Sequence, residues 1–139
     1  MQVLSKPKLR TYGLFKTQFG KESYITYNLS RKQRSMVAQI RFGILPLQIE
    51  TDRFRNIALQ QRICRLCNLG LVESEIHFLF VCPMYKHQRL QWIHEMNVRN
   101  YEWQQMNDHD KLTFIFQYPK YTAQYIMNSF VLRRSFLYN

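Results

Sequence analysis

Three cysteines and one histidine are the side chains in this sequence whose types and spacing could do chemistry. Cys64 and Cys67 form a C-x₂-C pair, His77 follows after nine residues, and Cys82 follows His77 after four more. These are all the cysteines in the chain, and an odd number of thiols makes a poor disulfide set. Three thiolates and one imidazole instead complete a tetrahedral site, so the sequence predicts that these four residues bind Zn²⁺.

Two alternatives to this site remain open from the sequence. Free cysteines are common in protein cores, so the three thiols could be buried core residues beside a chance histidine. His87 lies five residues after Cys82 and could replace His77, which is the least certain of the four ligands. A site with four protein ligands has no open position for an activated water, so we expect the zinc to be structural rather than catalytic.

The positive charge of the chain is concentrated in its first half. The net charge is +11, and thirteen of the twenty Lys and Arg residues but only three of the nine Asp and Glu residues precede position 66. A one-sided basic surface attracts polyanions, so we expect a nucleic acid, RNA or DNA, as the partner. The alternatives are a solubilising surface and a basic face that docks on an acidic protein.

A basic amphipathic helix over 31–42 is the best candidate for nucleic-acid contact. Ser30 is the expected N-cap, and Pro46 is expected to end the helix. Tyr85, beside the zinc ligands, is a candidate for stacking on a single-stranded base, although it also suits a core position. An ordinary helix with a solvated face is the alternative. The basic residues expected to contact phosphates are Arg31, Lys32, Arg34, Arg41, Arg53, Arg55, Arg62 and Arg65.

Hydrophobic periodicity predicts a mainly α fold, a small helical domain built around the zinc knuckle with short extended segments. Helical spacing covers 31–42, 83–98, 108–116 and 121–137, and an alternating pattern over 45–50 predicts an extended piece. In the first segment, 4–27, helical spacing runs from Leu9 to Phe19 with Gly20 as the candidate stop, and 24–27 is expected to be extended or to continue the core packing. Arg133 and Arg134 are expected to complement the dipole of the last helix. We divide the chain into a basic helical segment (1–60), a CCHC zinc knuckle (61–87) and C-terminal helices (88–139), expected to form one compact domain.

The sequence favours a binding protein over an enzyme. It contains three aspartates, too few and too scattered to hold two metal ions for polymerase chemistry, and four glycines, too few for a phosphate-binding loop. Nothing points to a small-molecule substrate. No apolar run approaches the length of a membrane span, and no secretory signal is visible. Cysteine usage suits a reducing compartment, so we expect a nuclear or cytoplasmic location; the oligomeric state stays open.

Six blocks of the sequence, in this order, resemble one known family. The resemblance is to the C-terminal tail of endonuclease–reverse transcriptase proteins of animal non-LTR (LINE-type) retrotransposons. It covers most of the chain and is strongest between residues 31 and 85. The blocks are LRTYGLFKTQF (9–19), RKQRSMVAQIRF (31–42), PLQIETDRF (46–54), RICRLC (62–67), ESEIHFLFVCP (73–83) and FVLRRSFL (130–137).

The resemblance implies a non-catalytic, nucleic-acid-binding role. In such elements the tail follows the polymerase and is thought to bind element RNA or target DNA during target-primed reverse transcription. The metal positions of the family correspond to Cys64, Cys67, His77 and Cys82, whereas its polymerase and endonuclease motifs have no counterpart in this sequence. The chain is then a fragment, a degenerate copy or a free-standing descendant of such a tail, or a remnant that folds poorly.

Overall fold

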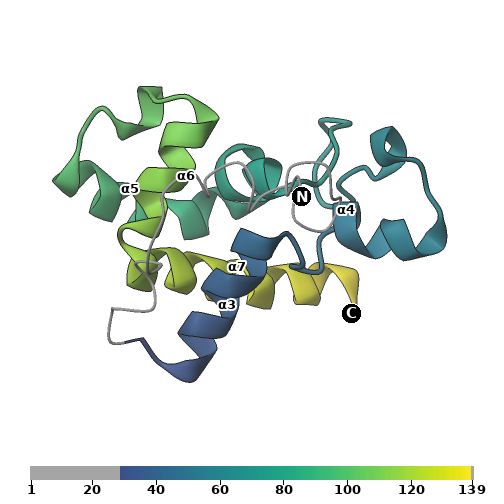
Figure 1. Ribbon diagram of the computed structural model, residues 1–139. Coiled ribbons are helices and arrows are strands. Elements are labelled where there is room, and N and C mark those ends of the chain that lie inside the picture. The colour runs from purple at the N-terminus through teal and green to yellow at the C-terminus, as the bar shows by residue number, and fades with distance from the viewer. Residues whose placement is uncertain (1–28, 139) are drawn as a thin grey trace, which may run out of the picture.

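The computed structural model describes residues 29–138, and this part of the chain is mainly helical (Figure 1). The segment 4–27, with its predicted helix, lies outside the described residues. The longer helices are α3 (Arg31–Phe42), α5 (Lys86–Arg99), α6 (Asp108–Phe116) and α7 (Pro119–Leu137), and a short helix, α4 (Gln48–Thr51), lies between the first two. The mainly α prediction is therefore confirmed.

Helix α3 covers the predicted residues, Arg31–Phe42, but Gly43 rather than Pro46 ends it. Ser30 Oγ accepts a hydrogen bond from Gln33 N at 3.1 Å, and Gln33 Oε1 accepts one from Ser30 N at 2.9 Å, which together form a capping box. Gly43 ends the helix in the left-handed region, with φ +70°. The prediction that Pro46 ends the helix is wrong, because glycine adopts this cap conformation without steric cost.

The segment over 45–50, predicted to be extended, turns into helix α4 instead. The carboxylate of Glu73 accepts a hydrogen bond from Gln48 N at 2.7 Å, and an anion at a helix N-terminus stabilises the first turn. A 3₁₀ turn, Asp52–Arg55, continues α4. Leu45, Leu47 and Ile49 are all buried, but Gln48 and Glu50 are buried as well, so the alternation does not separate a core face from a solvated face. The partner that decides the local structure lies 25 residues away.

A hairpin and a wide turn form the knuckle between α4 and α5. After a 3₁₀ turn at Leu59–Gln61, Ile63 pairs with Val72 in an isolated antiparallel bridge, and Gly70 between them has φ +69°. One turn of π-helix at His77–Val81 and a 3₁₀ turn at Pro83–Tyr85 then lead into α5. Within residues 29–138 this bridge is the only β pairing.

The C-terminal helices form as predicted, with two shifted starts. Helix α5 begins at Lys86 instead of residue 83, after the 3₁₀ turn at Pro83–Tyr85. Asn107 caps α6 by accepting a hydrogen bond from Asp110 N at 2.8 Å. Helix α7 begins at Pro119, two residues before the predicted start, because proline is well suited to the first turn of a helix. Among the described residues, no helix combines the length and the apolar character of a membrane span.

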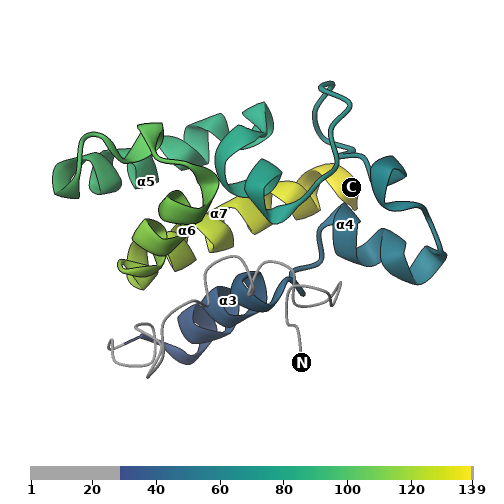
Figure 2. The ribbon, with the colours of Figure 1, turned by 45° about the horizontal axis from the view of Figure 1, so that its top comes forward.

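Helix α7 is the central support of the fold. Helices α3, α5 and α6 all contact it, and Figure 2 shows it between α3 and α5. The core is rich in aromatic rings: Trp92 stacks on Tyr125 with ring centroids 4.5 Å apart, and Phe78 lies 5.4 Å from Phe130. This one cluster also includes Ile40 and Cys82, so all three predicted segments contribute to it.

Candidate metal centre

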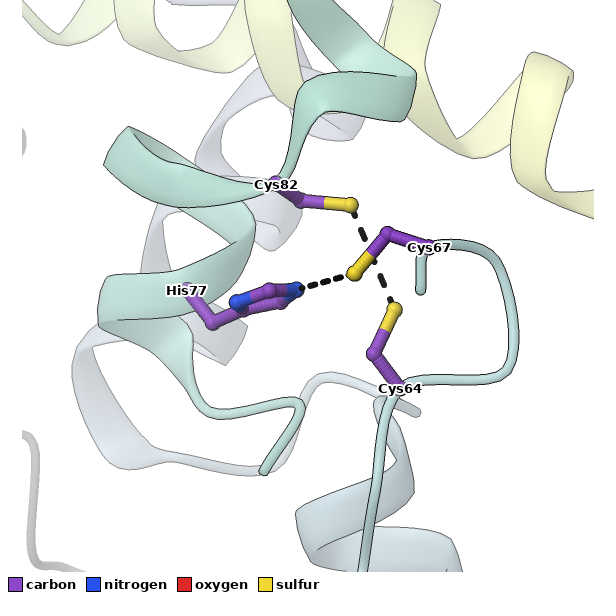
Figure 3. A group of neighbouring side chains, drawn as sticks. All are labelled: Cys64, Cys67, His77 and Cys82. Atoms are coloured by element: carbon purple, nitrogen blue, oxygen red, sulfur yellow. Dashed lines mark hydrogen bonds between the residues drawn. The ribbon is translucent and has the colours of Figure 1, made fainter. Parts of the chain in front are cut away.

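The four predicted ligands converge on one point (Figure 3). Their donor atoms all lie within 4.8 Å of one another. Cys64 Sγ lies 4.0 Å from Cys82 Sγ, and Cys67 Sγ lies 3.4 Å from His77 Nε2. A group of four side chains in the described residues is therefore arranged so that it could hold a metal ion.

Two of these separations match those of a tetrahedral zinc centre. Bonds of about 2.3 Å from zinc to sulfur and about 2.0 Å from zinc to nitrogen place two sulfurs about 3.8 Å apart and a sulfur about 3.5 Å from the imidazole nitrogen. The observed 4.0 Å and 3.4 Å differ from these values by a few tenths of an ångström. A disulfide between Cys64 and Cys82 would instead need the two sulfurs at bonding distance.

The first pair of ligands lies on the tight loop of the hairpin. Cys64 N donates to Leu71 O at 2.9 Å, which fixes Cys64 where the loop begins. Leu66 N donates to Cys64 Sγ at 3.4 Å, so the loop turns its backbone amide towards a sulfur. Such a bond stabilises the thiolate form that metal binding needs.

The second pair of ligands depends on the π-helical turn. In an α-helix, residues five apart point in directions about 140° apart around the axis, so His77 and Cys82 would diverge. The wider turn, closed by a hydrogen bond of 2.8 Å from Cys82 N to His77 O, brings both side chains to the same side. Single π-helical turns of this kind are frequent at functional sites. The π-helical turn therefore lets two side chains that are separated by four residues face the same point.

The site is largely withdrawn from solvent. Cys64, His77 and Cys82 are buried, and Cys67 is half-buried. A hydrogen bond with Cys82 lowers the pKa of the Cys64 thiol to about 3, while the same contact and burial raise the pKa of Cys82. Two thiols this close to each other disfavour a second thiolate, and a divalent cation would offset that repulsion.

The imidazole is aimed at the thiols and is not held by another group. His77 Nε2 points towards the Cys67 sulfur (Figure 3), and Nδ1 is buried with no hydrogen-bond partner among the described residues. His87, the alternative ligand, is exposed on α5 and is not part of the four-residue group.

Buried polar side chains from α5 and α7 hold the turn that carries His77 and Cys82. Arg89 donates to Cys82 O at 2.9 Å and to Phe78 O at 3.3 Å, and Tyr125 donates to Phe78 O at 2.6 Å. Burial raises the pKa of Tyr125 to about 12, so its hydroxyl stays a donor at neutral pH. Neither residue is identifiable from the sequence, because nothing in the spacing of Arg89 or Tyr125 distinguishes them from ordinary surface and core residues.

A buried ion pair ties the knuckle to the last helix. Arg133 donates to Glu73 Oε2 at 3.1 Å and to Oε1 at 2.8 Å, and both residues are almost fully buried. Burial alone would lower the pKa of Arg133, but the hydrogen bonds and charge of Glu73 raise it above its usual value. The prediction that Arg133 complements the helix dipole is therefore wrong, because its guanidinium pairs with Glu73, 60 residues away in sequence.

The predicted phosphate-contacting residues divide into two groups. Five of them are exposed, three at the start of α3 and two beside the knuckle: Arg31, Lys32, Arg34, Arg55 and Arg65. Arg53 pairs with Glu50 at 2.9 Å, and Arg62 donates to Ile57 O and Ile49 O, both at 2.9 Å. The structure thus gives Arg53 and Arg62 partners within the fold.

The structure contradicts the binding roles predicted for Arg41 and Tyr85. Arg41 is buried, with its guanidinium 5.1 Å from the centre of the Phe116 ring, so it does not present its charge to a ligand at the surface. Tyr85 is fully buried and packs edge-on against Phe78 at 5.0 Å, so it cannot stack on a base. In both cases the long or aromatic side chain covers apolar core surface, which the sequence pattern did not reveal.

No protein-family model, curated protein or solved structure matches this chain.

Proposed function

We propose that this protein is a zinc-stabilised, non-catalytic nucleic-acid-binding module. The observation that carries the proposal is the convergence of Cys64, Cys67, His77 and Cys82 within 4.8 Å. Three thiolates with one imidazole are the donor set of structural zinc sites, and soft thiolates favour zinc over magnesium, calcium or manganese. A complete tetrahedral set leaves no position for a substrate, so the metal's role is to hold the fold.

The start of helix α3 supports the nucleic-acid part of the proposal. Arg31, Lys32 and Arg34 are exposed there, and the first turn contains no acidic residue. The positive end of the helix dipole disfavours cations at this place by about 0.3–1 kcal/mol each. Their arrangement works against helix stability, whereas a polyanion bound at this end would be attracted by the side chains and the dipole together.

The resemblance to LINE-type reverse transcriptase tails agrees with this role. It implies that the partner is a polymeric anion, either element RNA or target DNA. We propose on this basis that the chain derives from such a tail and acts in the reducing compartments of the cell, nucleus or cytoplasm.

Charge reversal at α3 tests the proposal. Arg31→Glu with Lys32→Glu lowers the net charge by four and leaves Arg34, which donates to Leu29 O at 3.0 Å, in place. We expect the affinity of the zinc-loaded protein for a labelled single-stranded oligonucleotide to fall at least tenfold. The slope of log affinity against log salt should shrink by about 0.7 for each phosphate that the variant no longer neutralises. Fluorescence anisotropy over a salt series measures both quantities.

A matched control separates position from total charge. Lys86→Glu with Lys120→Glu changes the net charge by the same amount at exposed sites on α5 and α7. We expect this pair to weaken binding much less than the α3 pair does. Equal effects of the two pairs, or an affinity that does not respond to salt, would refute the assignment and favour a basic face that docks on an acidic protein.

A further inference from the structure

A hollow of about 200 Å³ lies beside the knuckle, where α4 meets the end of α7. Figure 2 shows the C-terminal end of α7 next to α4. Hydrogen-bonding side chains from three separate segments line the hollow, and no Asp or Glu is among its lining residues in the described part of the chain. The polar residues that line it are Gln48, Thr51, Arg55, Arg65, Arg133 and Tyr138.

Two arginines, Arg55 and Arg65, line this hollow, and neither forms a hydrogen bond with the nearby carboxylate of Asp52. Asp52 Oδ1 lies 3.7 Å from Arg55 Nη1 and 3.8 Å from Arg65 Nη2, which is too far for a hydrogen bond to either. The buried carboxylate therefore draws both guanidinium groups to one place and leaves their N–H donors available. Asp52 balances one of the two charges, and Glu73 balances Arg133, so one positive charge remains at the hollow.

The neighbouring polar groups also favour an anion. Thr51 Oγ1 donates to Gln48 Oε1 at 3.1 Å, so the part of the amide left for a ligand is its Nε2 donor group. The exposed ring of Tyr138 at the rim offers a flat surface on which a base can stack. Donors on the walls and an aromatic ring at the edge match a nucleotide, with its phosphate inside and its base at the rim.

The knuckle itself sets the position of these groups. Arg65 lies between Cys64 and Cys67 in the metal-binding loop, so a metal that fixes the two thiolates also fixes the backbone that carries Arg65. Glu73, which holds Arg133, lies on the returning side of the hairpin, where its N–H donates to Arg62 O at 3.0 Å.

We propose that this hollow is a phosphate pocket, in which Arg55 and Arg65 bind one backbone phosphate of a single-stranded nucleic acid. The inference rests on the proposed function and adds a specific site to it. Guanidinium groups pair with phosphate oxygens through two parallel hydrogen bonds, which a lysine cannot reproduce.

The test compares Arg55→Ala with Arg65→Ala, in one protein, against Lys86→Ala with Lys120→Ala. Both pairs remove two exposed charges from the zinc-loaded full chain. Binding of a labelled oligothymidylate, followed by anisotropy, should weaken roughly 10- to 100-fold for the arginine pair and less than about threefold for the lysine pair. Inorganic phosphate should compete with the wild type more strongly than chloride at equal ionic strength, and this excess competition should vanish in the arginine pair.

The possible failures can be told apart. If the wild type does not bind the oligonucleotide, both the proposed function and the pocket are wrong. If the arginine and lysine pairs behave alike while the wild type binds, the pocket is wrong and the proposed function stands. Should the arginine pair lose metal content, Arg55→Lys with Arg65→Lys decides the matter: the charge is kept, and wild-type affinity in this variant would overturn the role of the guanidinium groups.

Discussion

Replacing Arg133 by methionine should destabilise the protein more than any exposed substitution on the same helix. Methionine keeps most of the length and volume of the arginine stem but removes its charge and donors. Glu73, which is 0% exposed, would then keep a single hydrogen bond, from Gln48 N at 2.7 Å. A buried carboxylate that has lost its ion-pair partner is withdrawn from water and is left with an uncompensated charge.

The magnitude follows from this burial. Removing one partner of a buried ion pair costs about 3–5 kcal/mol, against a total stability of about 5–15 kcal/mol for a domain of ordinary size. Adding Glu73→Gln to Arg133→Met removes the orphaned charge, while the amide oxygen can still accept from Gln48 N. We expect the double variant to regain about 2 kcal/mol of the loss relative to Arg133→Met alone.

Urea unfolding of the zinc-loaded protein, followed by circular dichroism, measures these differences. Arg134→Met is the matched control, because Arg134 is the exposed neighbour on α7 and should cost less than about 0.5 kcal/mol. Metal content is measured for each variant so that loss of zinc is not mistaken for loss of the ion pair. A cost for Arg133→Met within about 1 kcal/mol of the control would refute the reasoning, since the pair would then behave as a solvated one.

Two further predictions concern the metal and the pH dependence. His77→Ala should abolish binding of one Zn²⁺ per chain and the charge-transfer absorption of a Co²⁺-substituted protein, whereas His87→Ala should keep both; metal retained by His77→Ala would contradict the ligand set. Since burial raises the pKa of Tyr125 to about 12, its neutral form stabilises the fold below the unfolded pKa of about 10, and this contribution is lost as the pH rises towards 12. Between about pH 9 and pH 11 the wild type should therefore lose about 1.4 kcal/mol relative to Tyr125→Phe in denaturant unfolding, and parallel pH profiles would contradict this.

The sequence by itself determined which four side chains form the cluster that could hold a metal, and most of the helices. Ligand type and spacing are local properties: a C-x₂-C loop, a histidine and a third cysteine identify a tetrahedral donor set without knowledge of the fold. The caps of α3 and α6 are equally local, because Ser30 and Asn107 bond to backbone groups three residues away. Such features need no distant partner and can be recognised along the chain.

Only the tertiary structure decided what the charged and aromatic side chains do. Arg41 and Arg65 look alike in sequence, but one lies buried over a ring of α6 and the other is exposed on the metal loop. The helical form of 48–51 depends on Glu73, which in turn is held by Arg133 from the last helix. A long cationic side chain or a carboxylate can face solvent, bond to the backbone or form an ion pair. Which of these it does depends on the surfaces that the packing brings together, and local sequence patterns do not contain that information.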